Sequence, residues 1–291
     1  MSRWRTVVIE NRSKLDLKIN NICVRGNDNV KFVNLSEIDT LILESTSISI
    51  TSALLCELVK QKVKVIFCDE KHLPLFEVTP YYDSYDSVTR IQKQFLWSNE
   101  TREKLWTEIV KEKIKNQMNI LKKYDKSEYK LLEKYIQEVE HNDSTNREGH
   151  AAKVYFNALF GKDFTRNSES SINIGLNYGY QILLSQFSKE IVQNGYLTQI
   201  GIHHKNQFNK FNLCSDLMEP FRPVVDEICY LANFEKFDKD EKHKVLEMFK
   251  KKIKIDNGNF YLVDAIKIYV KSVFKVLDEN KLEFLKVCDE F

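Results

Sequence analysis

Long hydrophobic segments are missing from this sequence of 291 residues. No run of about 18 apolar residues occurs, and a membrane-spanning helix requires such a run. Residues 1–10 also lack the apolar core of a signal peptide. We therefore expect no membrane contact, no export and a cytoplasmic location.

Two common signatures of metal and nucleotide sites are missing as well. The six cysteines form no CxxC pair, so a zinc site is not expected and the thiols should be reduced. No GxxxxGK[ST] loop occurs, although this loop holds the phosphates of nucleoside triphosphates in many enzymes. The sequence gives no sign of a reaction driven by nucleotide hydrolysis.

A strong excess of charge of one sign is also missing. The 44 basic and 42 acidic residues leave a net charge of +2, whereas proteins that wrap DNA usually present a pronounced basic surface. DNA binding would therefore need local patches or the charge of a partner. One such patch is Lys250, Lys251 and Lys252, which we interpret as a contact to the DNA backbone or as a plain exposed cluster.

The sequence changes character near residue 80. Before it, short runs rich in β-branched residues alternate with turn-like segments, and one helix-like stretch covers residues 52–60. A polar, tyrosine-rich linker is expected over residues 81–90. Beyond it, glycine and proline become rare and helix formers dominate. The expected fold class is α+β, with a small β domain over residues 1–80 and a larger, almost entirely helical catalytic domain over residues 91–291.

One long helix is expected at the start of the helical part. Residues 102–126 place apolar side chains at helical spacing among lysines and glutamates. This pattern is typical of an amphipathic helix with a solvated face. The same face is also a candidate for following the phosphates of a DNA strand.

Glu148 stands out because of its neighbours. In a helix, Ala151, Ala152, Tyr155 and Phe156 follow it at offsets that place the carboxylate on the apolar stripe. Burying an unpaired carboxylate costs several kcal/mol, roughly, so a cation is expected beside it. That cation is a bound metal ion or a basic side chain from elsewhere in the fold.

A second group of polar residues lies further along the chain. His204, Asp216 and Glu219 fall within 16 residues and, with Glu148, make a nitrogen and oxygen ligand set suited to manganese or magnesium. Alternatives stay open here too. Asp216 and Glu219 could be acids at a helix start, and a lone histidine is often structural. His203 and His204 are adjacent, so they cannot share a helical face.

Three blocks of the sequence carry a family resemblance. They are NREGHAAKVYF at residues 146–156, LNYGY at 176–180 and GIHHKNQFNKFNLCSDLMEPFRP at 201–223. The sequences of these blocks and their order resemble the CRISPR-associated spacer-acquisition integrase, CRISPR-associated protein one. GIHH and NQFN are similar to the type II-like form, which accompanies a single-protein, RNA-guided effector nuclease.

The resemblance implies a set of metal ligands. In the family these are the glutamate of the first block, the histidine that closes the G-x-x-H of the third block, and the last acid of its D-x-x-[DE] pair. Here the matching residues are Glu148, His204 and Glu219. Many relatives have aspartate where this chain has Glu219. Asp216 would support these ligands as a further candidate catalytic residue or bind the metal occasionally.

The implied activity is that of a divalent-metal-dependent DNA integrase and endonuclease. The 3′-hydroxyl ends of captured spacer DNA would attack the strands of a CRISPR repeat by transesterification. Arg147, Lys205 and Arg222 are weaker candidates for phosphate contact. Two alternatives stay open: a stand-alone metal-dependent nuclease of branched DNA, and a non-catalytic DNA-binding scaffold in which Glu148 and Glu219 only pair with lysines.

The implied partners are DNA and other proteins. The DNA would be captured spacer DNA and the leader–repeat duplex. The resemblance implies a homodimer formed through the β domain, and a heterohexamer in which two such dimers flank a dimer of the small second adaptation protein. The effector nuclease and a further adaptation subunit are additional candidate partners. Two strand attacks need two active centres, which a monomer with one site cannot provide.

Overall fold

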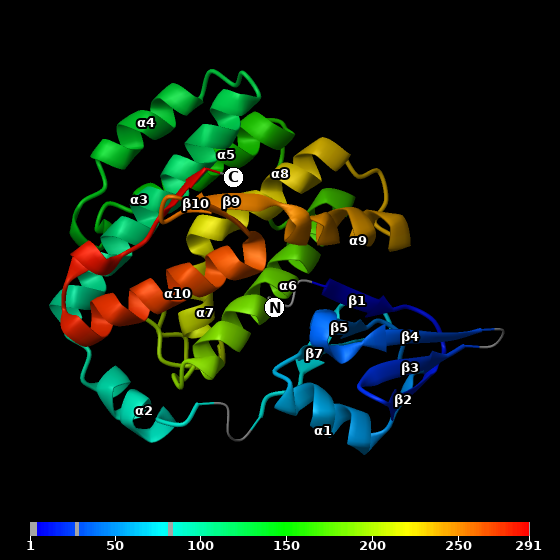
Figure 1. Cartoon of the computed structure of the whole chain (residues 1–291). Helices are drawn as coiled ribbons and strands as arrows, with labels where there is room; N and C mark the ends of the chain where they lie inside the picture. Colours follow the sequence, from blue (N-terminus) through cyan, green and yellow to red (C-terminus); the bar gives the residue numbers. More distant parts are fainter. Residues whose placement is uncertain (1–4, 27–28, 81–83, 291) are drawn as a thin grey trace. The chain divides into compact units, whose positions relative to one another are not determined.

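The structure is a computed structural model that describes residues 5–26, 29–80 and 84–290, with the side chains of residues 289 and 290 left aside. The chain forms two compact units, Met1–Tyr82 and Asp83–Phe291. Figure 1 shows strands in the first unit and mostly helices in the second. The predicted α+β class, with strands first and helices after, is confirmed.

In its described residues, the first unit contains two four-stranded sheets and one α-helix. In the first sheet the order is β1 (Arg5–Ile9), β5 (Ile38–Leu43), β7 (Lys64–Cys68) and β8 (Pro74–Glu77). In the second sheet the order is β4 (Val30–Asn34), β3 (Asn21–Arg25), β2 (Lys14–Lys18) and β6 (Ser49–Ile50). The strands β1, β5 and β7 run parallel, while β2, β3 and β4 form an antiparallel meander.

The core of the first unit explains its strands. Leu15, Ile22 and Leu41 from three different strands are fully buried in one hydrophobic cluster, and β5 is buried along its whole length, as expected for a central parallel strand. Helix α1 (Ser52–Lys60) begins where the Thr51 side chain accepts a hydrogen bond from Leu54 N. It coincides with the predicted helix over residues 52–60.

The second unit is built mainly from helices. They are α2 (Ser87–Phe95), α3 (Asn99–Lys123), α4 (Tyr129–Gln137), α5 (Arg147–Phe160), α6 (Ser171–Gln193), α7 (Asn212–Met218), α8 (Arg222–Ala232), α9 (Lys239–Leu246) and α10 (Leu262–Glu279). Short 3₁₀ turns are η1 (Leu35–Glu37) in the first unit, and η2 (His141–Asp143), η3 (Glu219–Phe221), η4 (Glu247–Lys250) and η5 (Leu282–Phe284) in the second. Across the described residues, no helix combines the length and the apolar character needed to cross a membrane.

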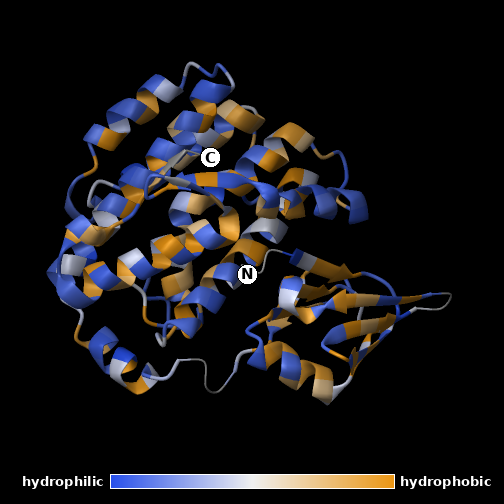
Figure 2. Cartoon of the chain, in the orientation of Figure 1, coloured by the Kyte–Doolittle hydropathy of each residue, from blue (hydrophilic) through white to orange (hydrophobic). Residues whose placement is uncertain are grey.

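Two long helices, α3 and α6, organise this unit. Helix α3 packs against α4, α5 and η3, and α6 packs against α7, α8 and α10. Gly179 lets α6 approach α8 closely, because a Cβ at this position would lie 2.4 Å from Val225 Cγ1. Figure 2 shows the contrast in colouring between the mixed faces of these helices and the mostly hydrophilic α9.

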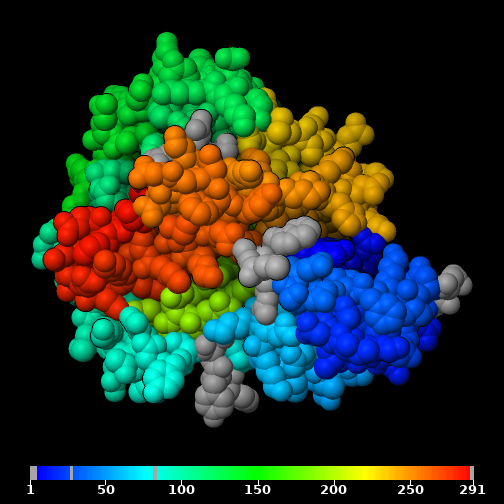
Figure 3. Space-filling view, viewed as in Figure 1, coloured from blue at the N-terminus to red at the C-terminus, as the bar shows by residue number. Residues whose placement is uncertain are grey.

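The second unit departs from the predicted helical composition through a small sheet. Its order is β10 (Gly258–Tyr261), β9 (Lys252–Ile255) and β11 (Cys288–Glu290), all antiparallel. In Figure 3 the region of β9, β10 and α10 covers much of the visible face of this unit. The hairpin forms because Asp256 and Asn257 adopt positive φ angles of 50° and 61°, which a tight two-residue turn between antiparallel strands requires.

The predicted linker over residues 81–90 is also too long. Residues 81–83 lie outside the described part of the chain, and α2 already begins at Ser87. The Asp86 side chain accepts a hydrogen bond from Arg90 Nε at 2.8 Å, which stabilises the first turn of α2. The polar composition of this segment therefore marks a helix start as well as a connection.

Candidate active site

Glu148 lies in the first turn of α5. The backbone N–H groups at a helix start have no partner inside the helix, and here two side chains accept from them. Asn146 Oδ1 accepts from the N–H of Gly149 at 3.3 Å, and the Asp143 carboxylate accepts from Arg147 N and Glu148 N at 2.8 and 3.1 Å. These bonds fix the position from which the Glu148 side chain projects.

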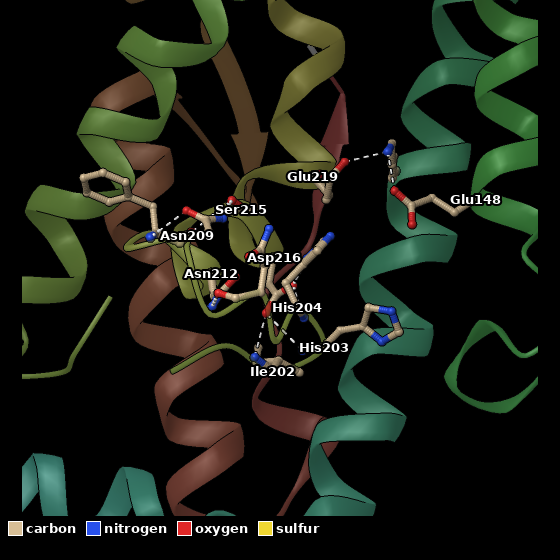
Figure 4. Close-up of polar contacts among 12 residues, drawn as sticks. Glu148, Ile202, His203, His204, Asn209, Asn212, Ser215, Asp216 and Glu219 are labelled. Carbon is tan, nitrogen blue, oxygen red and sulfur yellow. Dashed lines mark hydrogen bonds and ion pairs between the residues drawn. The ribbon is translucent and has the colours of Figure 1, made fainter. Parts of the chain in front are cut away.

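The carboxylates of Glu148 and Glu219 meet at one ammonium group, that of Lys113 in α3. Its Nζ lies 2.6 Å from Glu148 Oε1 and 2.5 Å from Glu219 Oε2, and dashed lines in Figure 4 mark both contacts. The Lys113 side chain is 10% exposed and that of Glu219 is 6% exposed. Glu148 therefore has a basic side chain as its cation, the alternative to a metal ion that the sequence left open.

Glu219 has a second cationic neighbour. Arg222 Nε donates to Glu219 Oε1 at 2.8 Å, and the Arg222 guanidinium lies 4.6 Å from the ring centre of Tyr180, in the LNYGY block of α6. Burial alone would raise the pKa of Glu219, but Arg222 and Lys113 outweigh it and hold this pKa below its usual value. Burial alone would lower the pKa of Lys113, but Glu219 and Glu148 outweigh it and raise this pKa. Glu219, Lys113 and Arg222 are therefore all charged at neutral pH.

Asp216 fixes the loop that carries Ile202, His203 and His204, which we call the histidine loop. It is fully buried in α7 and accepts hydrogen bonds from the backbone N–H groups of Ile202, His203 and His204 at 2.6, 3.0 and 3.1 Å. Figure 4 shows the loop gathered around this carboxylate. Gly201 makes the approach possible, since a Cβ there would lie 2.6 Å from Asp216 Oδ2. Asp216 lies within α7, so its interpretation as an acid at a helix start is wrong.

The imidazole of His204 is oriented by the same carboxylate. Its Nδ1 forms a short hydrogen bond with Asp216 Oδ1, so Nδ1 carries the proton and the lone pair lies on Nε2 when the ring is neutral. This bond to Asp216 raises the pKa of His204, and Glu219 and Glu148 add to the effect. A carboxylate behind an imidazole is the arrangement that supports metal-binding histidines in many proteins.

His203 takes a different position. Its ring stacks on the indole of Trp106 in α3, with ring centres 4.3 Å apart and planes 6° apart. The His203 and His204 rings lie 5.7 Å apart and nearly perpendicular. Burial against the indole lowers the pKa of His203, so this ring is neutral near pH 7.

The structure brings the predicted metal ligands together only in part. Among residues 5–26, 29–80 and 84–290, no three His, Cys, Asp or Glu side chains lie close enough to hold a metal ion. Glu148 and Glu219 share the Lys113 ammonium, while His204 is held by Asp216. The arrangement supplies two converging carboxylates and an oriented imidazole within electrostatic reach of them.

A family model described as CRISPR associated protein Cas1 matches residues 6–253. The chain belongs to the Cas1 family. The CRISPR-associated endonuclease Cas1 of Neisseria meningitidis serogroup C is 34% identical over 224 residues, which are 77% of this chain and 74% of that protein. CRISPR-associated endonuclease Cas1 1 of Francisella tularensis subsp. novicida is 27% identical over 236 residues, which are 74% of each chain.

Solved structures share the Cas1 fold. A CAS1 protein from Thermotoga maritima matches with a TM-score of 0.76 at 18% identity, over 94% of this chain and 97% of that one. A casposase bound to integration product matches with a TM-score of 0.76 at 18% identity, over 96% and 92%. A chain of a Cas6-RT-Cas1–Cas2 complex gives a TM-score of 0.77 at 17% identity, and this protein spans 37% of that longer chain.

The residues predicted to contact DNA phosphates lie in different settings. Arg147, Lys250 and Lys251 each form an ion pair with a glutamate, and the glutamate that binds Lys251 is buried. Lys205 and Lys252 are exposed. Lys205 is thus the exposed candidate in the histidine loop, whereas Lys251 has a structural partner. DNA contact by any of them stays a prediction.

Lys113 and Trp106 were absent from the predicted site residues. Both lie in the helix predicted over residues 102–126, which was interpreted only through its solvated face. A signal was available, because Lys113 follows Ile109 and Val110 by four and three positions and so shares their apolar face. A charged residue on the apolar face of a helix is also the pattern that distinguishes Glu148.

A buried acid beside the site gives a prediction for stability. Asp226 in α8 accepts a short hydrogen bond from the Tyr180 hydroxyl, and burial raises the pKa of Asp226 from 3.8 to about 6. The folded state favours the protonated form of Asp226. The stability that this preference adds to the fold is fully present below pH 3.8 and is lost as the pH rises through about 6.

Asp226→Asn should therefore be more stable than the wild type at neutral pH, by up to about 3 kcal/mol. The amide oxygen can still accept from Tyr180 while the cost of a buried charge disappears. Urea unfolding at a series of pH values measures the difference, which should vanish as the pH falls below 3.8. A variant that is less stable than the wild type at every pH would contradict this expectation.

Proposed function

We propose that this Cas1 protein joins the 3′-hydroxyl ends of captured spacer DNA to the strands of a CRISPR repeat. One observation carries the proposal: Glu148 and Glu219, from separate helical elements of a Cas1 family member, converge on a single cation beside the oriented imidazole of His204. The casposase with the same fold is bound to integration product, and relatives are named endonucleases. These names support DNA strand transfer or cleavage.

The donor types of Glu148, His204 and Glu219 fit a divalent cation of the magnesium or manganese class, although in this structure the three side chains do not converge closely enough to hold one. Two carboxylates already neutralise one positive group between them, and His204 keeps Nε2 as its metal-binding nitrogen. Glu148, His204 and Glu219 would hold the ion. When bound, it would lower the pKa of an attacking hydroxyl and offset charge on the phosphate. Lys113 and Arg222 favour the ionised form of Glu219, in which it can bind a cation.

The attacking group decides between joining and cutting. Water as the nucleophile gives a cut strand, whereas a DNA 3′-hydroxyl gives a joined strand and conserves the number of phosphodiester bonds. No nucleotide hydrolysis is then needed, consistent with the missing GxxxxGK[ST] loop. We propose joining with a related endonuclease activity, because the casposase of this fold is bound to integration product and relatives are named endonucleases.

A joining assay tests the proposed function. The full chain is incubated with the small second adaptation protein, short duplex DNA with labelled 3′ ends, a supercoiled plasmid that carries a repeat array, and Mn²⁺ or Mg²⁺. Label that becomes covalently attached to the plasmid supports the integrase. Nicking without attached label would favour the nuclease of branched DNA. DNA binding without either product would favour the scaffold.

The assembly follows from the need for two strand attacks. We propose a homodimer formed through the first unit, two copies of which flank a dimer of the second adaptation protein. The Cas6-RT-Cas1–Cas2 complex, whose chain shares this fold, supports a partner of that kind. The GIHH and NQFN wording supports a type II-like system, in which the effector nuclease and a further adaptation subunit are candidate partners.

Asp216→Asn should weaken joining by about 10- to 100-fold, because it disturbs the group behind a metal-binding imidazole. An amide cannot accept from three backbone N–H groups and His204 Nδ1 as a carboxylate does. Joining is measured at several Mn²⁺ concentrations. The loss should be smaller at high Mn²⁺, and an unchanged rate at every concentration would contradict the role of Asp216.

A further inference from the structure

Tyr180 in α6 contacts two arginine side chains at once. The guanidinium carbon of Arg222 lies 4.6 Å from the centre of its ring, and that of Arg166 lies 5.3 Å from it. At the far end of the ring, the Tyr180 hydroxyl donates a hydrogen bond to Asp226 Oδ1 in α8. Tyr180 is only 8% exposed. The hydrogen bond and the two guanidinium groups therefore fix the orientation of a buried ring.

Arg166 has anchors of its own outside the candidate active site. Its terminal nitrogens donate to Asn173 Oδ1 and to Asn177 Oδ1 in α6, the second at 2.7 Å. Asn173 in turn donates through Nδ2 to the carbonyl oxygens of Thr165 and Ser168, at 2.8 Å each. Arg166 is thus tied to the helix that carries Tyr180, and it supports the ring from a fixed position.

Arg222 connects this ring to one of the candidate metal ligands. Its Nε donates to Glu219 Oε1 at 2.8 Å, while its guanidinium lies over the Tyr180 ring. A guanidinium is planar and stacks on aromatic faces, so a fixed ring limits the directions in which its N–H groups can point. The direction of the Arg222 N–H groups then sets the orientation of the Glu219 carboxylate.

We propose that Tyr180 is a positioning residue of the active site, which acts through Arg222 to hold the Glu219 carboxylate in the orientation that metal binding requires. The inference rests on the proposed function, because it concerns the ion that Glu219 would hold. Asp226 keeps the ring in place, and the ring keeps Arg222 in place. Tyr180 has no direct contact with the reacting atoms in this role.

The aromatic face of Tyr180 is the feature that matters for this role. Tyr180→Leu should raise the Mn²⁺ concentration for half-maximal binding by about tenfold, the lower end of the usual range when support for a metal ligand is lost. Tyr180→Phe retains the face and should bind Mn²⁺ nearly as the wild type does. Arg222→Lys should repeat the effect of Tyr180→Leu, because an ammonium keeps the charge but cannot stack as a planar group.

The double variant Tyr180→Leu/Arg222→Lys separates positioning from general damage to the fold. If the ring acts only through Arg222, either single change already removes the interaction, and the double variant should bind Mn²⁺ no more weakly than the single variants. Independent effects would instead multiply, to about a hundredfold. Multiplied effects would contradict the proposal, because Tyr180 would then act by a route that does not include Arg222.

The measurement is Mn²⁺ binding to the full chain without DNA, followed through the electron paramagnetic resonance signal of free Mn²⁺. Tyr230→Leu is the control, since it removes a half-buried ring of α8 that packs against Tyr124 and Phe160. This control should bind Mn²⁺ normally. Thermal unfolding checks that each variant is folded. If Tyr180→Leu does not fold, Tyr180→Met takes its place, because methionine fills the space with a flexible, non-aromatic chain.

The readout distinguishes this inference from the proposed function. Equal Mn²⁺ binding by Tyr180→Leu and the wild type would overturn the positioning role even where strand joining is intact. The expected Mn²⁺ binding in every variant, together with no joining by the wild type, would support the positioning role and count against the integrase alone. Absence of Mn²⁺ binding by the wild type would overturn both.

Discussion

Replacing Glu148 by glutamine will reduce strand joining by at least about a hundredfold, because the proposed function makes this carboxylate a charged ligand of the metal ion. The change keeps the size of the side chain and the hydrogen bonds that Asp143 and Asn146 accept from backbone N–H groups at the start of α5. Lys113 retains Glu219 as its partner. The variant should therefore fold and bind DNA as the wild type does.

The measurement is the rate at which labelled spacer DNA becomes attached to a repeat-bearing plasmid. Glu133→Gln is a suitable control, since this glutamate is 54% exposed and lies 3.6 Å from Lys122 in a surface ion pair. The control should join normally. Full joining by Glu148→Gln would mean that Glu148 only pairs with Lys113 and takes no part in the reaction.

The sequence was sufficient for the broad fold because its strand and helix patterns differ strongly. The β-branched runs before residue 80 and the helix over residues 52–60 both match the structure closely. The small sheet in the second unit was missed, although KIKIDNGNF contains alternating residues and a DNG turn. Its lysines were interpreted as candidate DNA contacts. The alternating residues Ile253 and Ile255 indicate the strand, because both are fully buried.

A site residue could be predicted where its neighbours in the sequence show that it lies on a buried helix face. Glu148 follows this rule, since Ala151 and Tyr155 on the same helix face are fully buried. Contacts between distant elements follow no such pattern. Nothing in the spacing of Lys113 and Glu219 indicates that their side chains meet, and only the packing of α3 against α5 and η3 brings them together.

Replacing Lys113 by methionine should lower the metal-free stability by about 3–5 kcal/mol, the usual cost of breaking a buried ion pair. Two carboxylates then face each other without the ammonium between them, although Arg222 still pairs with Glu219. Chemical unfolding without metal measures this loss. Adding Mn²⁺ should restore more stability to the variant than to the wild type, because the ion replaces the missing positive charge.

The pH dependence of this loss has a definite sign. The lowered pKa of Glu219 gives stability that is present above its ordinary pKa of 4.5 and is lost as the pH falls through the lowered value. The raised pKa of Lys113 gives stability that is present below 10.5 and is lost as the pH rises through the raised value. The difference between wild type and Lys113→Met should therefore be largest between these limits and shrink on either side.

Lys111→Met is the matched control for Lys113→Met on the same helix. Lys111 is 36% exposed and lies 2.9 Å from Glu108, and exposed pairs of this kind contribute only about 0–1 kcal/mol. Equal stability of Lys113→Met and the wild type, or equal gains from Mn²⁺, would show that Lys113 does not hold the two glutamates. The expected result would mean that Lys113 holds the two carboxylates together, and that a divalent cation can take over this role when the ammonium is missing.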